Sequence, residues 1–388
     1  MRLFERVLGG TDAAACFADG ALVGRMLDVE VALARAEAEA GLFDRGAADA
    51  IARARESLEV DAAFLDRIAH DGARAGTVVV PLVAALRDAV AGADPAAARS
   101  VHRGAPSQGV IDTAMALATR DALAVVDRDA ARLVRALAAL ATAHAGTPML
   151  ARTLLQPAAA TTLGFKAAGW AASVARGRER IAQAAGEALQ LSLGGAVGTL
   201  AALGGEGPAV ARRLGAALDL PVPVAARHAQ RDGWVALGAA LGVLCGSLGK
   251  IGRDVALLAQ GEVGELAEPA GPGRGASSAM PHKRNPVAAL QAIAAATRVP
   301  GLVATLLAAM PQAHERGLGD WQAELATWPP LVVAVAGAAR ALADAAEEGF
   351  TVDAARMRAN LDAARLGDVE ADIRVAAARA SDLLTTLR

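Results

Sequence analysis

The chain has 388 residues, and its 39 basic and 41 acidic side chains leave a formal net charge of −2. Because the charges nearly cancel, the composition does not indicate binding to nucleic acid or to an acidic membrane surface. Aromatic residues make up only 3% and tyrosine is absent, while alanine and leucine dominate, a balance that favours helix over strand. We therefore predict an all-α fold, with ample chain for a buried core and more than one domain.

The first part of the chain predicts a small N-terminal helical domain over residues 1–100. The N-terminal charges are not followed by an apolar core and a cleavage site, so no signal peptide is indicated and we expect a cytoplasmic protein. Residues 21–40 place apolar side chains at steps of three and four with charges between them, which is typical of an amphipathic helix. Gly41 is expected to end that helix.

Residues 101–113 are polar and turn-like and precede a long helical pattern. Unpaired amides and the helix dipole at a helix N-terminus both favour negative charge, so we predict an anion site there, with Ser107 and Gln108 placed to serve it. From the residues alone, a plain N-cap role for Ser107 is the stronger alternative.

A central domain of long helices is predicted over residues 101–350. Helical patterns run over roughly 110–144, 160–193 and 232–266, and two more helices follow residue 286. In the third pattern leucine, isoleucine and valine form a heptad seam, and Gly238, Gly242 and Gly246 recur every four residues, which indicates close helix approach.

Two charge-poor stretches, 188–205 and 233–249, approach the length of a membrane span, but glycines and polar residues interrupt them. We interpret both as helices buried in a large bundle. One subunit of this size cannot cover helices so long and so poor in charge, so the bundle is expected to be shared between subunits.

A loop over residues 271–286, GPGRGASSAMPHKRNP, carries the strongest functional signal. Glycine and proline keep this segment out of helix, and loops on rigid scaffolds often hold catalytic groups. Taken as an arbitrary sequence it would be a surface loop of small residues. The string Ser277 to Pro286, however, resembles the signature loop of the fumarase/aspartase superfamily of lyases and cycloisomerases, with Ala276 where that family has glycine.

Two further segments carry the same resemblance. Residues 102–109 resemble the first conserved region of the superfamily, in which Ser107 is retained while Pro106 and Gly109 replace a threonine and an acidic residue. Residues 144–170 resemble the second conserved region, and Arg152, Thr153 and Gln156 are retained there.

Leu154 stands where most of the superfamily has a histidine. A leucine side chain cannot exchange a proton, so another group is expected to do that work. The branch that likewise lacks the histidine is that of the 3-carboxy-cis,cis-muconate cycloisomerases. Sequences of this branch also resemble this chain at residues 27–30, 107–108, 110–113, 164–170 and 228–232. The resemblance covers nearly the whole chain.

This resemblance implies the fumarase/aspartase-like (L-aspartase-like) fold, in which long helices of four subunits form a 20-helix core with active sites shared between subunits. It also implies a third small helical domain after about residue 364. Only some two dozen residues follow that point, so residues 351–388 are expected to be a short, truncated C-terminal helical segment.

The implied reaction is the intramolecular addition of a carboxylate across an activated double bond of a tricarboxylate, or its reverse. Ser277 is the expected proton-transfer group, with Ser278 as the alternative and His144 as the imidazole available for a second proton role. His144 could equally be a helix C-terminal charge facing solvent. The residues expected to bind substrate are His102, Ser107, Gln108, Arg152, Thr153, Gln156, His228, Gln230, Arg231, Met280, Lys283 and Asn285.

Two other functions remain open from the sequence. Adenylosuccinate lyase has a nearly identical signature loop, although Leu154 counts against it, and a non-catalytic structural member of the superfamily is conceivable given the substitutions at 106, 109 and 154. The sequence contains no dinucleotide fingerprint, phosphate loop or clustered metal ligands, so we expect catalysis without a cofactor.

Overall fold

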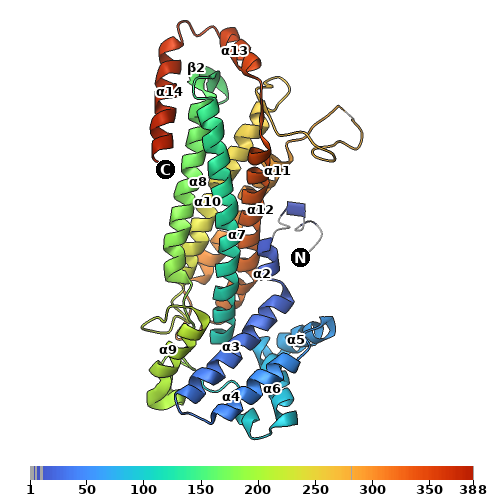
Figure 1. The fold of residues 1–388 in the computed structure, drawn as a ribbon, viewed down its shortest axis with the longest axis vertical. Helices are drawn as coiled ribbons and strands as arrows, with labels where there is room; N and C mark the ends of the chain where they lie inside the picture. The colour runs from blue at the N-terminus through green and yellow to red at the C-terminus, as the bar shows by residue number, and fades with distance from the viewer. Residues whose placement is uncertain (1–3, 5–6, 9–11, 281, 388) are drawn as a thin grey trace.

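The computed structural model describes residues 4, 7–8, 12–280 and 282–387, and it shows an elongated helical molecule (Figure 1). Long helices pack side by side in a central bundle, and α10 contacts α8, α11 and α12 along its length. The bundle helices are α7 Ser107–Ala143, α8 Leu163–Ala188, α10 Asp232–Leu258, α11 Val287–Ala309 and α12 Asp320–Glu348. The predicted all-α fold is confirmed.

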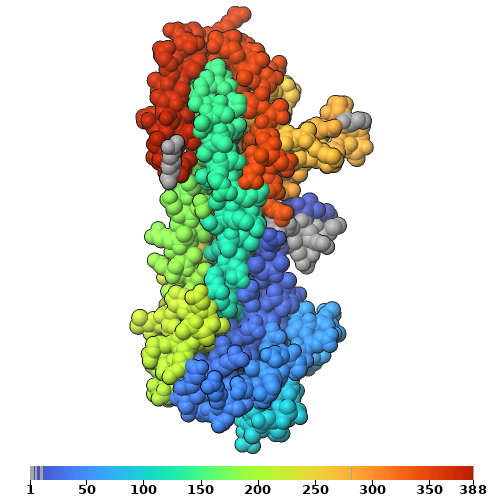
Figure 2. All heavy atoms as spheres, viewed as in Figure 1, coloured from blue at the N-terminus to red at the C-terminus, as the bar shows by residue number. Residues whose placement is uncertain are grey.

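The N-terminal helices from α3 onward gather at one end of the bundle, below it in Figures 1 and 2, while α2 lies against the side of α7 and α12. These N-terminal helices are α2 Asp12–Cys16, α3 Asp19–Glu39, α4 Arg45–Ser57, α5 Ala62–Ala75, α6 Val79–Ala93 and the 3-10 turn η1 Ala97–Ser100. The helix predicted over 21–40 is α3, and Gly41 follows it at φ +80°, as expected for a residue that ends a helix. The helix α9 Gly207–Leu218 packs against α3 at the same end.

The centre of the bundle is the seam predicted on α10. The residues of this seam are all buried, and they are Leu241, Leu244, Leu248, Ile251, Val255 and Leu258. A Cβ on Gly238 would lie 2.6 Å from Leu306 Cδ1 of α11, and one on Gly242 would lie 3.0 Å from Val303. These two glycines therefore permit close packing of α10 on α11, whereas a Cβ on Gly246 would meet nothing within 4 Å.

The helix limits differ from the predicted ones at both ends of α8. A β-hairpin precedes it, formed by β1 Pro148–Thr153 and β2 Gln156–Thr162, and the Thr162 side chain then caps the helix by accepting a hydrogen bond from Phe165 N at 3.1 Å. The segment 188–205 is not a buried helix as predicted. It is irregular up to the 3-10 turn η2 Ala201–Glu206, with Gly195 and Gly198 at positive φ.

The bundle is closed at the hairpin end by the C-terminal segments. A two-residue ribbon pairs β3 Leu266–Ala267 with β4 Thr351–Val352, so α10 ends earlier than the predicted residue 266. The helices α13 Ala354–Ala363 and α14 Glu370–Thr385 follow, and they pack on the hairpin, with α14 also lying along α8 (Figure 1).

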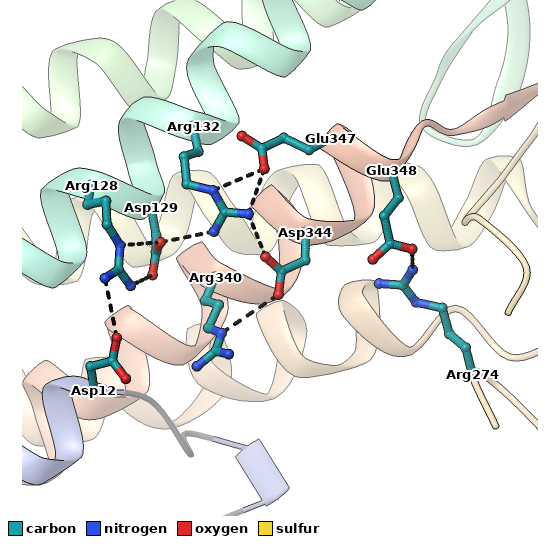
Figure 3. Close-up of polar contacts among 9 residues, drawn as sticks. All are labelled: Asp12, Arg128, Asp129, Arg132, Arg274, Arg340, Asp344, Glu347 and Glu348. Atoms are coloured by element: carbon teal, nitrogen blue, oxygen red, sulfur yellow. Dashed lines mark hydrogen bonds and ion pairs between the residues drawn. The ribbon is translucent and has the colours of Figure 1, made fainter. Parts of the chain in front are cut away.

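An ionic network centred on one buried carboxylate joins α7 to α12 (Figure 3). Asp129 is fully buried and accepts hydrogen bonds from Arg128 and Arg132 of its own helix. Arg132 also donates to Asp344 at 2.8 Å and to Glu347 at 2.6 Å. Because Arg132 serves carboxylates of both helices, it fixes how the two lie against each other.

Candidate active site

Ser107 and the residues around it lie at the N-terminal end of the bundle. Ser107 is the first residue of α7 and is half-buried, and the N-cap position is Pro106, so the plain N-cap role for Ser107 is wrong. Gln108 turns inward: it is 1% exposed, and its Nε2 donates to the carbonyl oxygen of His228 at 2.8 Å. Gln108 therefore ties the start of α7 to the segment that precedes α10.

The guanidinium of Arg231 lies between two carboxylates of its own chain. It donates to Asp112 at 2.8 Å and to Glu324 at 3.0 Å, and Trp321 Nε1 donates to the same Asp112 at 2.9 Å. Arg231 is 7% exposed. Its hydrogen bonds are used within the protein, so it fixes the start of α10 and the neighbouring, exposed Gln230; direct contact between Arg231 and substrate would require this network to open.

The two predicted histidines at this end, His102 and His228, differ in environment. His102 has φ +60°, and its Nδ1 lies 2.6 Å from Glu30 Oε1 of α3. His228 is buried, and its Nε2 has no hydrogen-bond partner among the described residues. Burial, with the positive charge of Arg316 beside it, lowers the pKa of His228 to about 4. The imidazole of His228 is therefore neutral at physiological pH.

The β-hairpin carries the second group of predicted residues to the opposite end of the bundle. Thr153 and Gln156 pair across its tip and are exposed. Arg152 points instead to the end of α10, where it makes a two-pronged contact with the buried Glu265 at 2.7 and 3.2 Å. That contact anchors the hairpin to the bundle, because Glu265 also accepts a hydrogen bond from Asn360 of α13.

Two leucines form the turn of the hairpin. Leu154 and Leu155 have φ of +51° and +65° and are 96% and 72% exposed. A two-residue hairpin turn with two positive φ values normally contains asparagine, aspartate or glycine. Left-handed backbone at a leucine costs about 1–2 kcal/mol, so these apolar residues occupy the turn against local preference.

His144 lies at the base of the hairpin and not at its tip. It is the C-cap residue of α7, and its Nδ1 lies 3.1 Å from Thr147 Oγ1. Five residue steps of β1 separate Pro148 from Thr153, which is about 17 Å of strand. Within one chain, the structure therefore does not bring His144 to Thr153.

The signature loop leaves the bundle through a narrow neck. Gly275 has φ +62°, its carbonyl oxygen accepts hydrogen bonds from the backbone and the side chain of Asn285 at 2.9 and 3.2 Å, and a Cβ at this glycine would overlap the backbone of Asn285. Arg274 is ion-paired to Glu348 of α12 (Figure 3). Glu268 accepts hydrogen bonds from two amides in the first turn of α11 and so fixes both ends of the loop.

Beyond the neck the loop projects away from its own chain (Figure 1). The Ser277 hydroxyl accepts from Met280 N at 3.1 Å, which makes a local turn. Ser278, Met280 and Lys283 are exposed and Ser277 is half-buried, while Pro281 lies outside the described residues. Within one chain, the predicted catalytic serines Ser277 and Ser278 therefore lie on a loop that points away from the bundle.

The predicted site residues therefore form two groups at opposite ends of the bundle. Ser107 begins α7 and the hairpin follows its end, so 37 helical residues, about 55 Å, separate Ser107 from Thr153. The signature loop lies at the hairpin end (Figure 1). One chain cannot place Ser107 and Ser277 around one small substrate.

Buried and half-buried carboxylates support the predicted site residues. The sequence analysis did not identify Asp112, Glu265, Glu268 or Glu324 as supporting groups. Asp112 lies in the segment 110–113 that carries the resemblance, whereas no local pattern marks the three glutamates. A cavity of about 800 Å³ between α2, α3, α11 and α12 contains none of the predicted residues. Among the described residues, no group of three or more His, Cys, Asp or Glu side chains is placed to hold a metal ion.

Known proteins resemble this chain over most of its length. A 3-carboxy-cis,cis-muconate cycloisomerase of Bradyrhizobium diazoefficiens is 50% identical over 345 residues, which are 89% of this chain and 76% of that protein. A nitrosuccinate lyase of Streptomyces davaonensis is 43% identical over 370 residues, 93% of this chain and 77% of that protein.

The crystal structure of 3-carboxy-cis,cis-muconate lactonizing enzyme from Pseudomonas putida has a TM-score of 0.88 at 44% identity, covering 100% of this chain and 86% of that one. The family model described as lyase matches residues 12–301. With a family match over most of its length and relatives at these identities, the chain belongs to this lyase family, the fumarase/aspartase superfamily of lyases and cycloisomerases.

Proposed function

We propose that the protein is a 3-carboxy-cis,cis-muconate cycloisomerase, which interconverts 3-carboxy-cis,cis-muconate and 4-carboxymuconolactone in the protocatechuate branch of the β-ketoadipate pathway, in the cytoplasm. The observation that carries the proposal is a site with a serine-bearing loop but no histidine at the hairpin tip. Ser277, Lys283 and Asn285 are present on the loop, while Leu154 occupies the tip. Relatives at 47–50% identity bearing this name support the same assignment.

The chemistry explains why a leucine is acceptable at the tip. When the lactone opens, a base removes a proton beside a carboxylate, the C–O bond breaks, and the oxygen leaves as a carboxylate. A carboxylate with a pKa near 4 leaves as an anion and needs no proton. The reaction thus requires one proton-transfer group, for which Ser277 is our candidate, and donors that stabilise the carbanionic intermediate.

Lys283 and Asn285 on the loop, with Thr153 and Gln156 on the hairpin, are the residues we assign to the substrate carboxylates. Closure of the loop would exclude water and bring the Ser277 hydroxyl to the proton that moves. Ser107, at the N-terminus of α7, would add the favourable end of a helix dipole for one further carboxylate. His144 has no place in this scheme unless a second copy brings it near the loop.

We further propose that the site is built between copies of the chain in a homotetramer. The separation of about 55 Å along α7 supports this, because the two groups of site residues can meet only across subunits. The helices α10, α11 and α12 are apolar and long enough to cross a membrane by length and composition, and α11 is the least buried of them. Its exposed Leu290 and Leu307 indicate a face that packs on another subunit.

The direct test is turnover of 3-carboxy-cis,cis-muconate, followed by the loss of the diene absorbance, beside adenylosuccinate and nitrosuccinate at equal concentrations. We expect activity with carboxymuconate to exceed that with the other two by at least about 100-fold, the range that differential binding of the wrong substrate readily provides. Preference for either alternative, or no activity with all three in a folded tetramer, would refute the proposal.

The role of Ser277 is tested by Ser277→Ala with Ser278→Ala as the matched control. Removing an acid-base group usually costs about 100-fold or more in kcat, so Ser277→Ala should fall by that amount with its melting temperature unchanged, because the loop adds little to the core. If Ser278→Ala shows the large loss instead, the proton-transfer group is Ser278.

A further inference from the structure

A cavity of about 510 Å³ opens beside the hairpin, between β1, the first turn of α8 and the end of α10. Its walls are mainly apolar, and its charged side chains are Arg152, Lys166, Lys250 and Asp254. The apolar residues include Met149, Leu150 and the two turn leucines Leu154 and Leu155. The cavity therefore adjoins the hairpin residues assigned to the substrate, but none of the roles proposed so far uses Lys166.

The charges around this cavity do not balance. Arg152 is paired with Glu265, and Lys250 is paired with Asp254, which also accepts a hydrogen bond from Trp170 Nε1 at 2.8 Å. Three cations thus face two carboxylates. The unmatched cation is Lys166, whose half-buried side chain has no hydrogen bond or ion pair within the described part of the chain.

The protonated form of the Lys166 amine is destabilised by its surroundings. Burial lowers the pKa of Lys166, the positive charges of Lys250 and Arg152 lower it further, and Asp254 and Glu265 only partly oppose this. An anion entering the cavity would supply the missing countercharge, and it would raise the same pKa. The leucine and methionine side chains of the wall suit a hydrocarbon chain. A phosphate usually requires several hydrogen-bond donors, whereas a single ammonium can bind one carboxylate, so a carboxylate is the better candidate anion.

We propose that this cavity is a subsite for one carboxylate of the substrate, with Lys166 as the cation that binds it. The inference rests on the proposed function for the identity of the substrate. The hydrocarbon next to that carboxylate lies against Leu150 and the Leu154–Leu155 turn. The exposed leucines of the hairpin then make apolar contacts with the substrate. Lys166 is then a substrate-binding residue that distinguishes a tricarboxylate from a dicarboxylate.

The chain has only three lysines, Lys166, Lys250 and Lys283, so amine acylation followed by mass spectrometry reports on each of them separately. With acetic anhydride over pH 7–10, we expect Lys166 to reach half of its maximal reactivity at a pH below the usual range for a lysine amine, because burial lowers the pKa of Lys166. Propane-1,2,3-tricarboxylate, a stable tricarboxylate, should slow acylation of Lys166 at least about 5-fold, while chloride at equal ionic strength should not. Lys250 lines the same cavity but is already paired with Asp254, so the tricarboxylate should protect it less than Lys166.

The kinetic test compares Lys166→Met, Lys166→Arg and the control Arg253→Met, which removes an exposed charge from α10. A charged hydrogen bond lost from substrate binding corresponds to about 10-fold or more, so KM for carboxymuconate should rise by that factor in Lys166→Met. Methionine fills the same space without a charge to bury, so the melting temperature should not fall. Lys166→Arg should recover part of the loss, and Arg253→Met should behave as wild type. With cis,cis-muconate, which lacks the third carboxylate, any activity should be affected less.

The two proposals fail in different ways. If wild type does not turn over carboxymuconate but tricarboxylate still protects Lys166, the proposed function is wrong and the subsite stands. If wild type is active while Lys166 is unprotected by propane-1,2,3-tricarboxylate and Lys166→Met keeps KM within 2-fold, the subsite is wrong and the function stands. The labelling is done on wild-type protein, so it tests whether the cavity binds the tricarboxylate even if Lys166→Met does not fold.

Discussion

Glu37 on α3 is a carboxylic acid with no solvent exposure, and neither of its oxygens has a hydrogen-bond partner in the described part of the chain. Burial raises its pKa to about 8; Arg103 opposes this rise and Glu30 adds to it. An acid whose folded pKa is raised binds a proton in the folded state that the unfolded state has lost. Stability therefore falls as the pH increases from about 4.5 to about 8.

We predict that Glu37→Gln stabilises the protein near neutral pH and not at pH 4. Glutamine resembles the protonated acid, so the two proteins should match at pH 4, whereas at pH 7 the variant should be more stable by about 3 kcal/mol. Thermal unfolding at both pH values checks this. A difference that does not change with pH would mean that Glu37 is ionised in the fold.

The arrangement around Arg231 shows what the sequence cannot tell at the level of single residues. Its motif was visible, and the resemblance suggested substrate binding. Its partners Asp112 and Glu324 are separated from it by 119 and 93 positions. Which charges meet is decided by how three helices pack, so no local pattern could distinguish a buried ion pair from a substrate ligand.

At the level of elements, the glycines of α10 are not equivalent, and this gives a matched pair of variants. Gly238→Ala would place a methyl group 2.6 Å from Leu306 Cδ1, whereas Gly246→Ala meets nothing within 4 Å. We predict that the first destabilises by about 1–3 kcal/mol through overpacking and that the second is neutral or gains up to about 1 kcal/mol of helix propensity. Denaturant unfolding of the two variants measures both values.

Equal effects at the two positions would contradict this account of the α10–α11 contact. A loss only at Gly246 would instead indicate that another subunit approaches α10 there, since the position is exposed in the single chain.

The neck of the signature loop provides a second prediction for an element. Gly275→Ala introduces a side chain at φ +62° that overlaps the Asn285 backbone, so the neck must shift. We expect kcat to fall at least about 10-fold, because small displacements of catalytic groups are costly. The melting temperature should change little. Gly271→Ala, at a loop glycine with open space around it, is the control; a similar loss in both would mean that general loop flexibility, and not the neck, matters.

The long helices could be predicted because apolar residues recur with the helical period over many turns. The hairpin could not, because its strands are short, and alanines in both suit a helix as well as a strand. The segment 188–205 was assigned to helix because absence of charge is shared by buried helices and glycine-rich loops. The motif residues were found by resemblance, whereas their separation into two ends became visible only in the fold.

For the whole molecule, the two-ended site predicts complementation between inactive variants. Ser107→Asp places a negative charge where a substrate carboxylate is expected, and a helix N-terminus tolerates aspartate. Mixed with Ser277→Ala, unfolded and refolded together, it should regenerate up to roughly one quarter of wild-type activity, since each site draws two segments at even odds in a closed assembly. Each variant refolded alone should remain inactive.

Hybrid tetramers without recovered activity, or an active monomer on a sizing column, would rule out sites built between subunits. Ser107→Thr, which keeps the hydroxyl, is the control for the first variant and should retain activity.

The length of α7 has a consequence for how such an enzyme behaves at low concentration. If the two ends of the bundle meet only across subunits, an isolated chain has no site at all, so specific activity depends on protein concentration by mass action and falls on dilution below the dissociation constant of the assembly. Substrate binds only where ends of different chains have come together, so by the same linkage it draws dilute chains into assembly. A progress curve started from dilute enzyme would then show a lag that shortens as substrate is raised.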